Sequence, residues 1–125
     1  MRILLDTHVA FWWFNDVDRV GHDARVAIQD SSNDVWMSAA SVWEVGIKRA
    51  VGRLEIPTPL DEAARETGVM ELAVTWAHAR TAAELPLLHG DPFDRMLVAQ
   101  AQLEELVLLT RDPLVRQYDV ATMPA

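Results

Sequence analysis

Short apolar runs recur along the chain, separated by polar segments with helical spacing. Five of these runs have the composition of buried or edge strands: Arg2–Leu5, Val35–Ser38, Val69–Val74, Leu106–Leu109 and Tyr118–Met123. The intervening segments predict helices over His8–Asn15, Gly21–Asp30, Ser41–Ala50, Asp61–Thr67, Thr75–Leu85 and the stretch that follows Asp91. Strands that alternate with helices pair in parallel, so the pattern predicts a three-layer α/β/α fold with a mostly parallel central sheet.

The segment Gly90–Gln102 opens with two acids and continues as an almost unbroken apolar run. Pro92 suits the first position of a helix, which places Asp91 at the N-cap and Asp94 one turn further in. Residues three apart share one face of a helix, so the two carboxylates are neighbours. Acids that only cap a helix are the simple interpretation of this segment.

Other acids follow the predicted strands in the same way. Asp6 ends the first strand, Glu44 lies near the start of the helix after Val35–Ser38, and Asp112 follows Leu106–Leu109. Ligands of α/β sheets bind beyond the carboxyl ends of the strands. We therefore expect Asp6, Glu44, Asp94 and Asp112 to meet at one edge of the sheet.

Composition narrows the class of protein. The 125 residues suit a single domain, residues 1–125, and half of them are hydrophobic. No cysteine is present, which excludes thiolate catalysis and cysteine-bound zinc. The apolar runs are too short to cross a membrane and Asp6 interrupts any signal-peptide core, so we expect a cytoplasmic protein. The net charge of −8 argues against a broad basic surface for phosphates.

Carboxylates gathered in one cleft need a cation or raised pKa values. Oxygen ligands without cysteine favour Mg²⁺ or Mn²⁺, and such ions activate water for phosphodiester hydrolysis. We expect Asp6 and Asp94 to be the main metal ligands, with Glu44 and Asp112 completing the site directly or through water.

Three further residues flank these acids and are candidates for substrate contacts. The Thr7 hydroxyl follows Asp6 and can face the same ions or waters. Arg95 and Arg111 each adjoin an acid and are candidates for steering a phosphate into the cleft.

Structural explanations exist for several of these residues. Ser38 and Ser41 are both possible caps of the helix that follows Val35–Ser38. Glu44 can form a capping box with Ser41 or an ion pair with Lys48, and Asp112 can be an N-cap only. The four histidines lack ligand spacing, and we interpret them as structural or surface residues, with His89 the one placed to touch substrate. The five tryptophans are interpreted as core or interface residues rather than base-stacking platforms.

Four segments of the chain resemble the signature segments of PIN-domain nucleases, and in particular the VapC-like toxins of type II toxin–antitoxin systems. They are Ile3–His8, Ser38–Lys48, Asp91–Ala101 and Leu109–Asp112. Each carries an acid, their order and spacing fit, and together they extend over essentially the entire chain.

The resemblance implies a Mg²⁺- or Mn²⁺-dependent endoribonuclease that acts on RNA, is held inactive by a cognate antitoxin protein and forms a homodimer. It also implies the strand order 3-2-1-4-5. The first three acids of the family match Asp6, Glu44 and Asp94, and the fourth falls in the segment of Asp112. Asp91 is a second candidate in the central segment, as a cap or outer ligand.

Two alternatives compete with this interpretation. A phosphoaspartate device needs an acid beside the strand-one aspartate or two residues after it, and Leu5 and His8 occupy those positions. A PIN-like module that binds RNA or protein without cutting it is compatible with the sequence.

Overall fold

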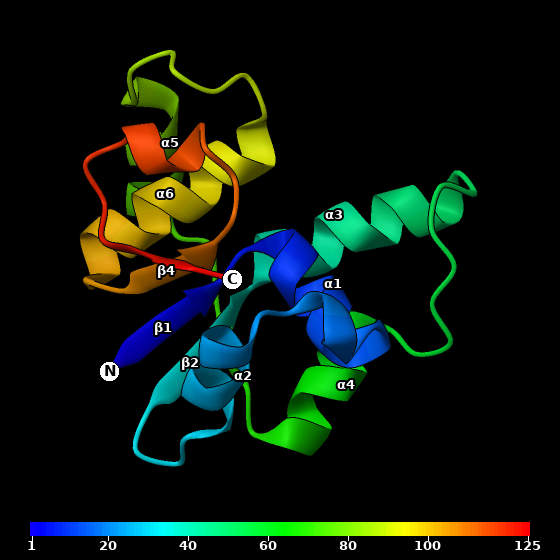
Figure 1. Ribbon diagram of the computed structural model, residues 1–125. Helices are drawn as coiled ribbons and strands as arrows, with labels where there is room; N and C mark the ends of the chain where they lie inside the picture. The colour runs from blue at the N-terminus through cyan, green and yellow to red at the C-terminus, as the bar shows by residue number, and fades with distance from the viewer.

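The computed structural model describes all residues from Met1 to Ala125 and contains a five-stranded, wholly parallel sheet (Figure 1). The strands are β1 (Arg2–Leu5), β2 (Asp34–Ser38), β3 (Met70–Leu72), β4 (Val107–Thr110) and β5 (Thr122–Pro124). They lie in the order β3-β2-β1-β4-β5, which confirms the predicted strand order. The first strand of the chain is therefore the central strand of the sheet.

Six α-helices and two short 3₁₀ helices connect the strands. They are α1 (Thr7–Asn15), η1 (Val17–Arg19), α2 (His22–Gln29), α3 (Ala39–Ala50), α4 (Leu60–Thr67), α5 (Trp76–Glu84), α6 (Pro92–Glu104) and η2 (Val115–Gln117). None of these helices is long and apolar enough to traverse a lipid bilayer.

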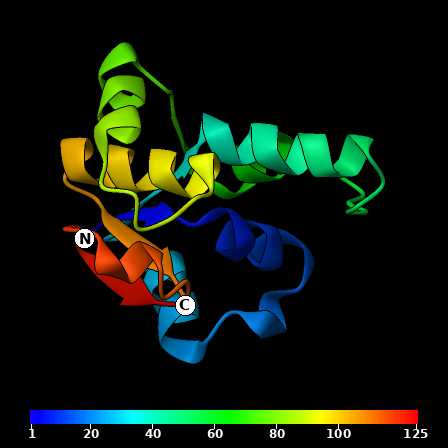
Figure 2. The same cartoon turned by 90° about the horizontal axis from the view of Figure 1, so that it is seen from above.

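Helices cover both faces of the sheet because successive strand residues point to opposite sides. Ile3 and Leu5 of β1 pack with the apolar side chains of α1, α2 and α4, whereas Leu4 packs with those of α5 and α6. All three leucine and isoleucine side chains are fully buried. Figure 2 shows α5 and α6 above the sheet and α1 and α2 below it, which confirms the predicted three layers.

The helix starts agree with the predicted caps at two positions. The Asp91 carboxylate accepts from the backbone N–H of Phe93 at 2.8 Å and of Asp94 at 3.3 Å, and Pro92 follows it at the first helical position. Ser38 caps α3 by accepting from Ala40 N–H at 3.0 Å. These caps fix where the acids of the following turns are presented.

Two other local predictions are wrong. Ser41 lies inside the first turn of α3, so it does not form a capping box with Glu44, because Ser38 already starts the helix. The segment Tyr118–Met123 is not one strand: Tyr118 follows η2 and is buried, and only the last residues pair as β5.

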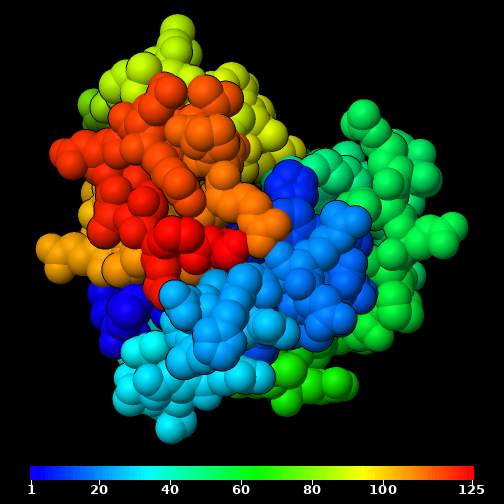
Figure 3. Space-filling model, in the orientation of Figure 1, coloured from blue at the N-terminus to red at the C-terminus, as the bar shows by residue number.

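The C-terminal residues lie against the start of α2, where Figure 3 shows the red and light-blue segments in contact. A Cβ atom at Gly21 would lie 3.3 Å from the carbonyl carbon of Ala125. The guanidinium of Arg111 donates to the carbonyl oxygens of Ala125 and Arg19 in the same place. A residue without a side chain therefore suits position 21.

Candidate active site

Asp6 lies at the carboxyl end of the central strand and is 4% exposed. Its Oδ2 atom accepts a hydrogen bond of 2.5 Å from the hydroxyl of Thr110, which ends the adjacent strand β4. Its Oδ1 atom is buried and has no hydrogen-bond partner. An unpartnered buried carboxylate oxygen is costly, so this atom is positioned for a ligand that the protein does not supply.

Glu44 repeats this arrangement on α3. The residue is 4% exposed, Oε2 accepts from the Lys48 ammonium at 2.8 Å, and Oε1 is buried without a partner. The predicted Glu44–Lys48 pair is therefore present, and it neutralises the glutamate in part. Nearby, the hydroxyl groups of Thr7 and Ser41 share a buried hydrogen bond of 2.8 Å, which ties the start of α1 to α3.

Asp94 and Asp112 meet at a histidine. His89 Nε2 lies 3.0 Å from Asp94 Oδ2 and 2.9 Å from Asp112 Oδ2. One potential ligand atom from each of these three residues lies within 4.8 Å of the other two, and no other trio of acidic or histidine side chains is as close. Asp6, Glu44 and Asp94 thus do not by themselves form so tight a group.

Electrostatics nevertheless join Asp94 to the other acids. The pKa of Asp94 is raised to about 7 by burial and by the charges of Asp6, Asp91 and Glu44. Burial also raises the pKa of Asp6, although the Thr110 hydroxyl opposes this shift. We refer to Asp6, Glu44, Asp94 and Asp112 as the acid cluster; the carboxylates of Asp6 and Glu44 lie close enough to disfavour the ionised form of Asp94.

Asp112 differs from the buried acids. Burial alone would raise its pKa, but hydrogen bonds from His89 and from the backbone N–H of Leu114 lower it overall. The predicted capping contact of Asp112 is therefore present at the start of the turn that leads to η2. Asp112 is also held by the Thr110 hydroxyl, which accepts from its backbone N–H at 3.1 Å.

His89 was not predicted as part of the cluster. Its Nδ1 atom accepts from the backbone N–H of Asp91 at 3.1 Å, which requires an unprotonated Nδ1 and leaves the proton on Nε2, facing Asp94 and Asp112. Burial lowers the pKa of His89, but Asp112 and Asp94 raise it overall. The only feature of the sequence that could have placed His89 near the acids was its position two residues before the Asp91 cap.

Arg95 corrects a prediction. It is 8% exposed and its guanidinium donates to the carbonyl oxygens of Ala82, Leu85 and Pro86 at 2.9 Å each. It also donates to the Tyr118 hydroxyl at 3.2 Å. The group therefore holds the loop after α5 and does not face a phosphate, because adjacent positions on a helix point in different directions.

Arg111 is likewise engaged by the protein. Its guanidinium donates to the carbonyl oxygen of Ala125 at 2.6 Å and lies 4.5 Å from the centre of the Trp12 ring. This arrangement does not support the predicted phosphate-steering role. Asp91 is occupied by capping α6, and its role as an outer ligand stays a prediction.

The acid cluster fits a hard divalent cation. Its donors are carboxylate oxygens, two of them buried without partners, and their combined charge raises the pKa of Asp94. Mg²⁺ and Mn²⁺ prefer such ligands. Glu44 and Asp6 would each offer a free oxygen, and Asp94 and Asp112 would offer the carboxylates that His89 now joins.

Comparisons with known proteins agree with this fold. The model of the PIN domain family matches residues 3–121. Ribonuclease VapC22 of Mycobacterium tuberculosis is 29% identical over 119 residues, which span 93% of this chain and 91% of the relative. Ribonuclease VapC16 of the same organism is 34% identical over 61 residues, 46% of this chain and 43% of the relative.

Solved structures show the same fold at lower identity. VapBC2 from Rickettsia felis, bound to a DNA fragment from its promoter, contains a chain with a TM-score of 0.73 and 15% identity, covering 99% of this chain and 98% of that one. A toxin–antitoxin complex from Klebsiella pneumoniae gives a TM-score of 0.66 and 17% identity, with 97% and 95% covered. The family match extends over nearly every element described above, and this chain belongs to the PIN-domain family.

Proposed function

We propose that this protein is an endoribonuclease that uses Mg²⁺ or Mn²⁺ held by Asp6, Glu44 and Asp94, with Asp112 as a further ligand, directly or through water. The observation that carries the proposal is the pair of buried, unpartnered carboxylate oxygens on Asp6 and Glu44 beside an aspartate whose pKa is about 7. Membership of the PIN-domain family and the names of two relatives, both ribonucleases, support RNA as the substrate.

The protein orients each acid through one oxygen and leaves the rest of the carboxylate for the site. Thr110 holds Asp6 Oδ2, Lys48 holds Glu44 Oε2, and His89 holds one oxygen each of Asp94 and Asp112. These four carboxylates would hold a divalent cation, whose chemistry there would be to make a bound water more acidic and to offset negative charge on the scissile phosphate. The buried hydrogen bond between the hydroxyl groups of Thr7 and Ser41 holds the start of α1 against α3 beside the acids.

The biological role that we propose is that of the toxin in a toxin–antitoxin pair. Similar folds occur in the VapBC2 assembly and in the Klebsiella pneumoniae toxin–antitoxin complex. The partner would be an antitoxin protein that blocks the acid cluster, and the site of action would be the cytoplasm. A homodimer accords with the large exposed apolar side chains, among them Trp43 and Trp76.

Cleavage assays with matched variants test this function. We expect the wild type to cut RNA in Mn²⁺ or Mg²⁺, and Asp6→Asn and Asp94→Asn to lose on the order of 10²–10³-fold in rate, the loss typical of one electrostatic stabiliser. Asp119→Asn removes the same charge at an exposed position and should cut like the wild type.

Equal cleavage by Asp94→Asn and Asp119→Asn would show that the acid cluster is not the catalytic site. A wild type that binds RNA but never cuts it, with either metal, would favour a non-cleaving PIN-like module. Growth arrest on expression of the wild type, and its absence for Asp94→Asn, tests the toxin role separately.

A further inference from the structure

A cavity of about 360 Å³ adjoins the acid cluster on the side of α1 and α3. Thr7 and Lys48 are among the residues that line it. Thr7 directly follows Asp6, and Lys48 binds Glu44 at 2.8 Å. No member of the acid cluster lines the cavity, but Thr7 places it next to Asp6 in the chain and Lys48 connects it to Glu44 through an ion pair.

The lining of this cavity is basic, in contrast to the net negative charge of the chain. Three cationic side chains, Arg19, Lys48 and Arg53, line it and no acid does, although the chain carries a net charge of −8. Three positive charges therefore lie beside the acid cluster, to which Lys48 is joined through Glu44. A polyanion that must approach the acid cluster would find its cationic contacts here.

The three cations differ in how far the protein occupies them. Arg19 pairs with Asp16 at 3.0 Å, and both side chains are more than half exposed, so that pair is weak. Lys48 is bound to Glu44. The exposed Arg53 side chain makes no hydrogen bond or ion pair, and its charge is free for a ligand.

Aromatic rings form the other wall. His8, Phe11 and Trp12 line the cavity, and the His8 and Trp12 rings lie 5.9 Å apart at a tilt of 31°. The Arg111 guanidinium lies over the Trp12 ring, 4.5 Å from its centre. Aromatic faces beside cations are the two components of sites for unpaired nucleotides, where bases stack and phosphates bind basic side chains.

We infer that this cavity is a subsite for one nucleotide of a single-stranded RNA, next to the phosphate that the acid cluster would cut. The base stacks against the wall that contains His8, and the phosphate of the nucleotide binds Arg53. The volume lies within the roughly 300–1,000 Å³ typical of ligand pockets. The inference rests on the proposed ribonuclease function and adds the position of a flanking nucleotide.

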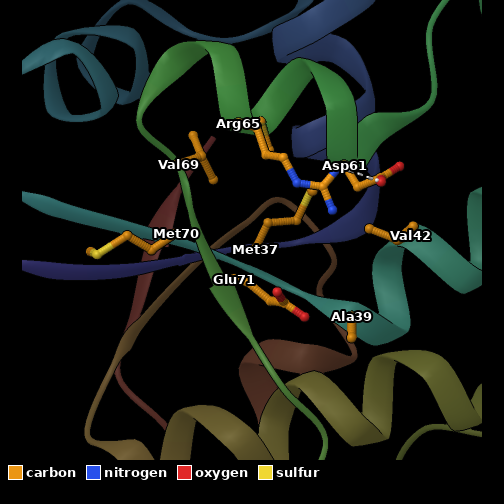
Figure 4. A pocket seen from close by; sticks show the side chains of 9 residues that line it. Met37, Ala39, Val42, Asp61, Arg65, Val69, Met70 and Glu71 are labelled. Carbon is orange, nitrogen blue, oxygen red and sulfur yellow. Dashed lines mark hydrogen bonds and ion pairs between the residues drawn. The ribbon is translucent and has the colours of Figure 1, made fainter.

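A second cavity shows that these features are not general to the surface. It measures about 310 Å³ and lies between α4 and the β2–β3 edge of the sheet (Figure 4). Its lining is mainly apolar, its one arginine, Arg65, pairs with Asp61 at 2.9 Å, and Glu71 adds a further acid. Such a lining does not suit a phosphate.

The experiment measures binding of a fluorescent single-stranded RNA of about 12 nucleotides, within the length that such sites accommodate. Asp94→Asn is the background, so that the RNA is not cut. Arg53→Ala should weaken binding about tenfold, the loss expected for a charge-assisted hydrogen bond. The slope of log affinity against log salt should fall by about 0.7, one phosphate contact on a single strand.

The control is Arg65→Ala, which removes the same side chain and charge from the second cavity. It should bind RNA within about twofold of the background. His8→Ala should weaken binding roughly 5- to 100-fold if a base stacks on that wall, and His8→Phe should recover most of the affinity. If His8 stacks on a base, His8→Phe should restore RNA affinity and leave the salt dependence unchanged. If His8 has only a structural role, His8→Phe should not restore the affinity.

Each outcome separates the inference from the proposed function. If the wild type cuts RNA but Arg53→Ala and His8→Ala bind it as Arg65→Ala does, the subsite is wrong and the nuclease stands. If the wild type does not cut RNA, the proposed function fails, whatever the binding shows. A parallel titration uses an oligoglutamate peptide; loss of peptide binding alone in Arg53→Ala would assign the cavity to an acidic protein segment and overturn the inference.

Discussion

Arg95 and the acid cluster are both buried charged groups, and the protein treats them in opposite ways. The Arg95 guanidinium has hydrogen bonds to three backbone carbonyls at 2.9 Å and to the Tyr118 hydroxyl, with no carboxylate in contact. Asp6 and Glu44 each retain a buried oxygen without any partner. The charge of Arg95 is satisfied within the fold, whereas that of the acids is not.

This difference indicates a structural role for Arg95 and a ligand-binding role for the acids. Arg95 and Tyr118 together hold the loop that carries His89, because Tyr118 also accepts from the backbone N–H of Leu88 and His89 at 3.2 and 2.9 Å. The acids have like charges close together, which destabilises the folded protein unless a cation is bound. This repulsion arises at the carboxyl ends of the strands, where a bound cation would relieve it.

Removing the Arg95 side chain should have the largest effect on stability. Arg95→Leu leaves the carbonyl groups of Ala82, Leu85 and Pro86 buried without donors, so we expect a loss of about 2–4 kcal/mol in the free energy of unfolding. Urea denaturation of the metal-free protein measures it. Arg80→Leu is the matched control at an exposed position and should change stability by less than about 0.5 kcal/mol. Equal stabilities would mean that the Arg95 contacts contribute little.

His89 should affect the acid cluster without affecting the fold to the same degree. His89→Ala removes the N–H that orients Asp94 and Asp112, and such outer partners commonly change metal affinity by 10- to 100-fold. We expect Mn²⁺ binding to weaken by about that factor, and His89→Gln, which keeps a side-chain N–H donor, to recover part of it. The exposed His22→Ala serves as control. Unchanged Mn²⁺ affinity in His89→Ala would remove the orienting role.

The acid cluster should also make the metal-free protein less stable as the pH rises. Asp94 has a pKa of about 7 in the folded protein against 3.8 ordinarily, so between these values the folded state holds a proton that the unfolded chain has lost. The free energy of unfolding therefore falls as the pH rises from about 4 to about 7. His89, with a raised pKa, contributes a fall in the same direction.

Thermal melting at about pH 5 and pH 7.5 measures this dependence. We expect Asp94→Asn to melt a few degrees higher than the wild type near pH 7.5 without metal, and to show a smaller change between the two pH values. Asp119→Asn should follow the wild type. An Asp94→Asn protein that melts well below the wild type in metal-free buffer contradicts the proposed repulsion.

The strands and the helix starts around this site could be predicted from the sequence because they depend on local patterns. Alternating apolar runs fix the strands, and Pro92 after Asp91 fixes the start of α6 and hence the place of Asp94. Parallel strands bring their carboxyl ends to one edge, which places Asp6 near the helix starts. The strand order 3-2-1-4-5 came from the family resemblance rather than from spacing.

The partners of the charged side chains were not predictable in the same way. Arg95 is one residue from Asp94 in the sequence, but its position on α6 directs it toward the loop after α5. His89 reaches Asp112 across 23 residues through a loop whose shape depends on Tyr118 and Arg95. Such contacts depend on the tertiary path of a loop, which no local periodicity encodes.

A calorimetric titration of Mn²⁺ into the metal-free protein tests the central claim most directly, that the acid cluster is completed by a divalent cation. The account predicts saturable binding to the wild type and to Asp119→Asn, with a large loss of affinity in Asp6→Asn and in Asp94→Asn. Equal affinities across all four proteins, or no saturable binding to the wild type, would contradict it.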